Sequence, residues 1–178
     1  MLRFNSDHKF KIMQIADTQE IPAVSPDTLS LINNALDREK PDLVIFTGDQ
    51  IKGYSKKFKK DPAIIESTID ILVEPIAKRN IPFMVTYGNH DAQCGVDNRG
   101  QYKFYAKYDN FISGDLRNSD DVGTADIQIY SSTEDKPVFE LYIIDSHGKA
   151  KDGAGYAPVD KKQIEWYVSR REQLKAEN

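Results

Sequence analysis

The stretch Pro82-Phe83-Met84-Val85-Thr86-Tyr87-Gly88-Asn89-His90-Asp91 decides the fold, because it leads from an apolar run directly into a polar, glycine-containing turn. The apolar run predicts a strand, and the glycine predicts where that strand ends. An earlier stretch has the same design, with the apolar run Leu43–Phe46 followed by Thr47-Gly48-Asp49. Short and uniformly apolar runs are typical of parallel strands that are covered on both faces. The two stretches therefore predict two buried parallel strands with polar residues at their carboxyl ends.

Helices are predicted on both sides of Leu43–Phe46. The apolar-rich run Phe10–Ala16 predicts a first strand, and Ser25-Pro26 has the pattern of an N-cap followed by a first-turn proline. Apolar residues then recur at helical spacing until Pro41. A second helix is predicted from Asp61-Pro62, which again supplies a cap and a proline before apolar residues at helical spacing. The first half of the chain therefore alternates strand, helix, strand, helix, strand.

The second half predicts a hairpin and a last helix. Residues 100–125 have no firm periodicity, and we expect a partly helical excursion there. The runs Ile127–Tyr130 and Val138–Ile144 predict two strands joined as a hairpin. Asp160 and Gln163 form a capping-box pattern in front of a helix. The whole order predicts an α/β sandwich with mixed β-sheets, built as a single domain over residues 1–178.

Composition excludes several classes of protein. The 178 residues carry 24 basic and 28 acidic side chains, a formal net charge of −4, which disfavours binding to duplex nucleic acid. The longest apolar runs have four residues, far short of a membrane span, and the first ten residues contain no signal-peptide core. The single cysteine, Cys94, cannot form a bridge within the chain. We therefore expect a cytoplasmic protein that does not enter membranes.

Polar residues follow four of the predicted strands. They are Asp17, Gly48-Asp49, Gly88–Asp91 and Asp145-Ser146-His147. Ligands of open α/β sheets bind beyond the carboxyl ends of the strands, so we expect these residues at one rim. Carboxylates that lie close together repel each other, and a divalent cation removes that conflict. The sequence therefore predicts a metal site, in which Asp49 is placed to bridge two ions.

Three motifs give the chain a resemblance to a known family. In order they are Asp17-Thr18-Gln19, Gly48-Asp49 and Gly88-Asn89-His90-Asp91. In these motifs the chain resembles the calcineurin-like metallophosphoesterase superfamily, and within it bacterial proteins similar to purple acid phosphatases. The resemblance implies two divalent or trivalent ions, Mn, Fe or Zn, held in the intact site. It implies a phosphate-ester substrate, mono- or diester, hydrolysed by attack of a metal-bound hydroxide. The implied metal ligands are Asp17, Asp49 and Asn89, together with Gln19, which either coordinates the metal or only hydrogen-bonds to a bound water. The implied catalytic residues are His90, which assists the leaving oxygen, and Asp91, which either orients His90 or only stabilises the turn.

The chain departs from the family pattern in three places. Family members carry histidine where this chain has Gln19, and the purple subgroup carries a ligand tyrosine where this chain has Lys52, with Tyr54 two residues later. The later histidines of the family, one of them in a Gly-His-x-His motif, do not occur before Asn178. We therefore expect an N-terminal portion of the domain, incomplete at its C-terminus and inactive alone.

Alternatives remain for the function and for single residues. The main alternative is a non-catalytic metal- or phosphate-binding module with a degenerate site, which Gln19 supports. A Rossmann- or flavodoxin-type nucleotide binder is disfavoured, because residues 17–20 form no glycine-rich turn. His147 is either at the rim of the site or in solvent, and Cys94 is expected to be inert. The basic run Lys56–Lys60 is either a solvated loop or a lip that attracts an anionic phosphate ester.

Overall fold

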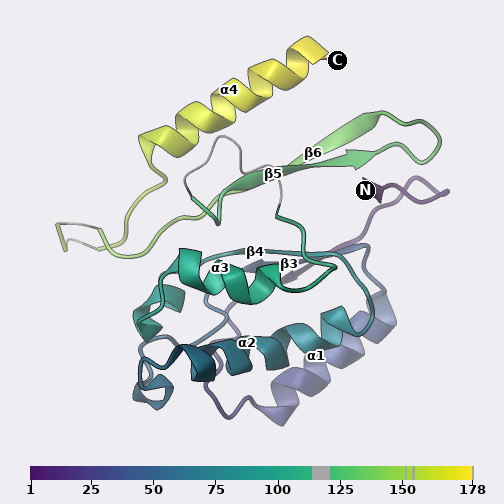
Figure 1. Ribbon diagram of the computed structural model, residues 1–178. Helices are drawn as coiled ribbons and strands as arrows, with labels where there is room; N and C mark the ends of the chain where they lie inside the picture. The colour runs from purple at the N-terminus through teal and green to yellow at the C-terminus, as the bar shows by residue number, and fades with distance from the viewer. Residues whose placement is uncertain (114–120, 151, 154, 178) are drawn as a thin grey trace.

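Two sheets stack on each other, and helices cover their outer faces (Figure 1). The computed structural model describes residues 1–113, 121–150, 152–153 and 155–177. One sheet is parallel, with strand order β2-β3-β4. Its strands are β2 Ile12–Ile15, β3 Leu43–Thr47 and β4 Phe83–Thr86. The other sheet has the order β1-β5-β6, with β5 parallel to β1 and antiparallel to β6. Its strands are β1 Leu2–Arg3, β5 Ala125–Tyr130 and β6 Pro137–Ile143.

Helices begin where the sequence supplies caps. Ser25 and Asp61 accept bonds from the backbone amides two residues later, and a proline follows each of them at the start of its helix. The helices are α1 Pro26–Glu39, α2 Pro62–Ala77, α3 Asn98–Ala106 and α4 Lys161–Glu177, and two 3₁₀ turns, η1 Lys56–Phe58 and η2 Asp91–Cys94, follow β3 and β4. Within the described ranges, no helix is both long enough and apolar enough to cross a membrane.

The central strand β3 is buried on both faces, as its apolar run predicts. Val44 and Phe46 belong to the core that packs against α1 and α2. Leu43 and Ile45 point the other way and pack with Ile127 of the second sheet. The layers are therefore helices α1 to α3, the parallel sheet, the mixed sheet and helix α4, as Figure 1 shows.

The hairpin and the last helix are also as predicted. Strands β5 and β6 pair antiparallel. Asp160 and Gln163 exchange reciprocal bonds of 2.9 Å at the start of α4. Trp166 of α4 packs against Tyr142 of β6, with ring centroids 6.0 Å apart.

The structure adds two details to the expected arrangement. The hairpin joins the short strand β1 in a second sheet, which is mixed, whereas β2, β3 and β4 form a parallel sheet of their own. The partly helical excursion expected over residues 100–125 contains helix α3, which begins slightly earlier because Asp97 caps it through the amide of Gly100. The remainder of that prediction falls partly on residues 114–120, which lie outside the described residues.

Candidate functional site

The turns after β3 and β4 contact each other at the carboxyl ends of these strands. The backbone amide of His90 donates to Asp49 Oδ1 at 2.8 Å. A Cβ atom on Gly88 would lie 2.2 Å from that same oxygen and 2.6 Å from the backbone nitrogen of Asp49. Only glycine fits at such a distance. Gly88 therefore lets the turn after β4 close over the Asp49 carboxylate, so that the two glycine-containing motifs form one structure.

The turn after β2 lies alongside them. The amide of Asp17 donates to the carbonyl of Gly48 at 3.0 Å, and the amide of Gln19 donates to the carbonyl of Asp49 at 2.9 Å. Asp17, Gln19 and Asp49 all have left-handed backbones, with φ values of 53°, 43° and 54°. Non-glycine residues rarely adopt this conformation, and such strained positions cluster at functional sites. The structure thus brings together the backbones of all three motifs that the sequence singles out.

Asp91 lies beneath these turns. Its side chain accepts bonds from the amides of Asp49 and Gly88, both at 2.8 Å, and from that of Ile51 at 3.3 Å. Only 1% of the residue is exposed. Burial raises the pKa of Asp91 to about 6, although the amide bonds favour its charged form. These bonds hold the backbone of the two glycine turns, as the alternative of a turn-stabilising Asp91 predicts, and a role of Asp91 in orienting His90 stays a prediction.

The imidazole of His90 is oriented by a residue that the sequence did not single out, Gln93. His90 Nδ1 lies 3.2 Å from Gln93 Oε1, and Gln93 Nε2 donates to the carbonyl of Asn89 at 3.1 Å. The second contact fixes the side-chain amide of Gln93 with its oxygen toward the imidazole. Nδ1 therefore carries a proton, and Nε2 is the nitrogen that is available to a substrate. Tyr54 packs edge-on against the ring at 4.8 Å between centroids. A glutamine three residues after a histidine is no signal by itself; the turn η2 creates the contact.

The side chain of Asn89 has an unpaired polar end. Its Nδ2 atom is buried and has no hydrogen-bond partner among the described residues. Buried polar atoms are nearly always paired, so this end of the amide is open to a ligand.

Comparisons with known proteins agree with this geometry. The family model described as calcineurin-like phosphoesterase matches residues 10–176. The chain belongs to the calcineurin-like phosphoesterase family. It is 33% identical over 190 residues to "Phosphatase DCR2" of Saccharomyces cerevisiae, covering 93% of this chain and 32% of that protein. It is 28% identical over 206 residues to "Probable inactive purple acid phosphatase 14" of Arabidopsis thaliana, covering 99% and 50%. The chain thus spans between about a third and a half of the length of these relatives.

The donors of this calcineurin-like site are oxygen atoms. Within the described ranges, no group of three or more His, Cys, Asp or Glu side chains is placed to hold a metal. The residues gathered by the three turns offer the carboxylates of Asp17 and Asp49 and the amides of Gln19 and Asn89. Carboxylate and amide oxygens fit a hard cation such as Mg²⁺ or Mn²⁺. A metal ion of the softer kind would need imidazoles, which Asp17, Gln19, Asp49 and Asn89 do not supply.

The other histidines and the cysteine have different surroundings. His8 lies at the far side, 3.1 Å from Ser132 Oγ. His147 Nε2 contacts Asp121 at 3.2 Å. The neighbouring Gly148 is beside the site, because a Cβ atom there would lie 3.9 Å from the carbonyl of Asn89. Cys94 is buried, and burial raises the pKa of its thiol, which agrees with an inert side chain.

Proposed function

We propose that the intact protein is a metal-dependent phosphoesterase that hydrolyses a phosphate mono- or diester at the carboxyl ends of β2, β3 and β4. The observation that carries this proposal is the contact between the three turns, with Asp49 bonded to the backbone of His90. Membership of the calcineurin-like family supports the reaction class. The name of the yeast relative, a phosphatase, supports it as well.

Each residue of the site has a proposed task. Asp17, Asp49 and Asn89 hold a cation through oxygen atoms, and Gln19 adds its amide oxygen. The bound cation supplies positive charge to the phosphoryl oxygens and lowers the pKa of a bound water. In its doubly protonated form, His90 donates the proton on Nε2 to the leaving oxygen, and the proton on Nδ1 stays bonded to Gln93. Tyr54 limits the rotation of the imidazole.

A second candidate function is a non-catalytic metal- or phosphate-binding module. Gln19 replaces a histidine of the family pattern, and a glutamine amide is a weaker metal ligand than an imidazole. The names of the relatives from Arabidopsis thaliana, "Probable inactive purple acid phosphatase" 14 and 29, favour the same candidate. Both candidates use the same oxygen donors, so they differ only in turnover.

Hydrolysis and metal binding measured on the same samples distinguish the two candidates. Nitrophenyl phosphate and bis-nitrophenyl phosphate are assayed with Mn²⁺ or Zn²⁺, using the 178-residue chain and a form extended to the length of its relatives. We expect little turnover by the chain alone and metal-dependent turnover by the extended form, which Asp49→Asn abolishes. Metal binding without turnover in both forms would favour the binding module. Absence of both metal binding and turnover would contradict the phosphoesterase and the metal-binding module.

A further inference from the structure

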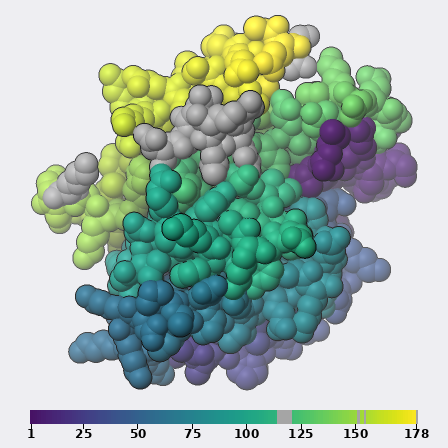
Figure 2. Space-filling model, in the orientation of Figure 1, coloured from purple at the N-terminus to yellow at the C-terminus, as the bar shows by residue number. Residues whose placement is uncertain are grey.

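A cavity opens beside His90. It has a volume of about 360 Å³ and lies between the loop after β3 and the turn η2. Figure 2 shows the loop, in the blue of residues 50–60, at the lower left of the molecule. Tyr54 and Gln93 line the cavity, and the same two side chains contact the imidazole of His90. The cavity is therefore separated from the catalytic imidazole by one layer of side chains.

The wall of this cavity is positively charged. Lys56, Lys59 and Lys60 line it, and its lining contains no acidic residue from the part of the chain that the structure describes. The ion pairs formed among the described residues include none of these three lysines. Cations that face one cavity repel each other, and an anion between them turns that repulsion into attraction. The charge of the wall thus selects an anionic occupant.

The backbone that carries the lysines is held against the turn η2. A Cβ atom on Gly53 would lie 1.9 Å from the carbonyl of His90, so the two chain segments touch backbone to backbone. Phe58, between the lysines, is only 1% exposed and anchors the loop in the core. The stem of Lys60 lies against Gly95, whose added Cβ would be 3.1 Å from it. The cavity is therefore preformed, which lowers the entropic cost of binding a ligand.

We propose that this cavity, which we call the lysine subsite, binds a second phosphate group of the substrate. The substrate is then a small molecule that carries one phosphate as the ester to be cleaved and another that rests on Lys56, Lys59 and Lys60. This inference rests on the proposed function, because it assigns a substrate class to the same catalytic centre.

Anion binding in the absence of metal tests the subsite by itself. Protein freed of metal on a chelating resin is titrated with inorganic pyrophosphate, and the dissociation constant is measured by calorimetry. Lys57→Ala is the matched control, because Lys57 belongs to the same basic run but does not line the cavity. We expect the double variant Lys59→Ala/Lys60→Ala to weaken binding at least about threefold and Lys57→Ala to leave it unchanged. If the double variant and Lys57→Ala weaken pyrophosphate binding equally, or if neither weakens it, the assignment of the lysine subsite is wrong.

Hydrolysis tests the assignment of the substrate. The extended form is assayed with a hexose bisphosphate and with the matching hexose monophosphate. We expect a higher kcat/KM for the bisphosphate, and a preference that Lys59→Ala/Lys60→Ala reduces at least about threefold while Lys57→Ala retains it. Hydrolysis of both esters without preference would overturn the substrate assignment and leave the proposed function in place. Failure to hydrolyse either ester or any nitrophenyl ester would contradict the proposed function itself.

Discussion

The imidazole of His90 has one nitrogen engaged and one available. Gln93 accepts from Nδ1, so a proton on Nε2 is the one that reaches a leaving oxygen. In the extended form, His90→Ala should lower kcat by about 10²–10⁴-fold, the range of a positioned general acid. The loss should be smaller for nitrophenyl esters than for alkyl esters, because a nitrophenolate leaves without protonation. Equal losses on the two substrates would rule out proton donation, and loss of metal from the variant would make His90 a ligand instead.

Asp91 should matter for stability more than for the orientation of His90. Its carboxylate satisfies the amides of Asp49, Ile51 and Gly88 in a buried place. Asp91→Ala leaves these donors unpaired, and we expect the free energy of unfolding to fall by about 2–4 kcal/mol. Asp91→Asn keeps an acceptor and should recover part of the loss. Denaturant titration measures the free energy of unfolding of the two variants. An unchanged midpoint for Asp91→Ala would contradict the role assigned to this carboxylate.

At the scale of the elements, the close contact of two turns depends on the missing side chain of Gly88. In Gly88→Ala the new Cβ would lie 2.2 Å from Asp49 Oδ1, so one turn must move. We expect a loss of about 1–3 kcal/mol in unfolding free energy together with weaker metal binding. Gly148→Ala is the matched control, because its added Cβ meets nothing closer than 3.9 Å. A Gly88→Ala variant as stable as this control would mean that the turns are not packed as described.

The predictable elements are those that short stretches of sequence determine. The strand β3 follows from its apolar run, and the starts of α1 and α4 follow from Ser25 and from Asp160 with Gln163. The strand β1 could not be predicted, because it has two residues and its partner β5 comes from the other half of the chain. For the same reason the sequence did not reveal that the hairpin belongs to a second sheet.

The same distinction applies to the candidate site. The positions of Asp17, Asp49 and Asn89 at neighbouring strand ends could be predicted, because parallel strands bring their carboxyl ends to one edge. The contact between His90 and Gln93 could not, because it depends on the path of η2. The sequence left two roles open for Asp91, because proximity to His90 along the chain does not tell which way a buried carboxylate points.

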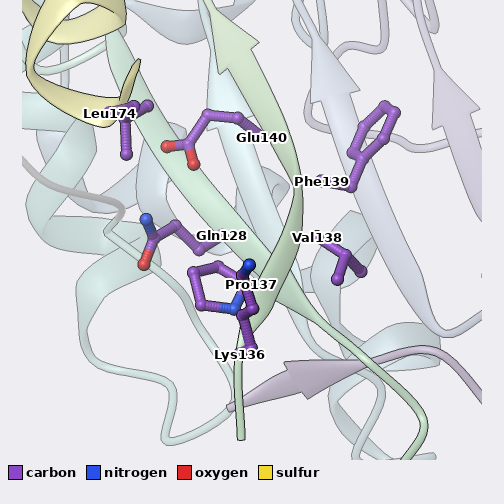
Figure 3. A pocket seen from close by; sticks show the side chains of 7 residues that line it. All are labelled: Gln128, Lys136, Pro137, Val138, Phe139, Glu140 and Leu174. Carbon is purple, nitrogen blue, oxygen red and sulfur yellow. The ribbon is translucent and has the colours of Figure 1, made fainter. Parts of the chain in front are cut away.

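At the scale of the whole molecule, helix α4 covers the mixed sheet, and charged side chains lie between the helix and the sheet. Arg170 of α4 lies 2.8 Å from Asp126 of β5 and 3.7 Å from Glu140 of β6. Glu140 also lines a cavity with Leu174 of α4, where Figure 3 shows the two side chains near each other. Burial, followed by the neighbouring Asp126 carboxylate, raises the pKa of Glu140. The fold therefore favours the protonated form of Glu140.

This arrangement predicts a dependence of stability on pH. A carboxyl group whose pKa is raised by folding stabilises the protein fully below its unfolded pKa, and the contribution is lost as pH rises through the folded value. We expect the free energy of unfolding to be lower at pH 9 than at pH 5. Glu140→Gln, which stays neutral, should reduce that difference by about 1–2 kcal/mol. Denaturant titrations at pH 5 and pH 9 measure the free energy of unfolding of both proteins. If Glu140→Gln shows the same difference between the two pH values as the unmodified chain, Glu140 is not the cause of the pH dependence.

The measurement that tests the metal centre most directly is calorimetric titration of this chain with Mn²⁺. We expect weak binding of one ion, because the oxygen donors of Asp17, Asp49 and Asn89 act without imidazoles. We expect Asp49→Ala to abolish binding. Asp135→Ala is the control and should leave binding unchanged, because it removes an exposed carboxylate that is paired with Arg3, far from the site. Binding by Asp49→Ala as tight as that of the unmodified chain would contradict the assignment of the three turns as a metal centre.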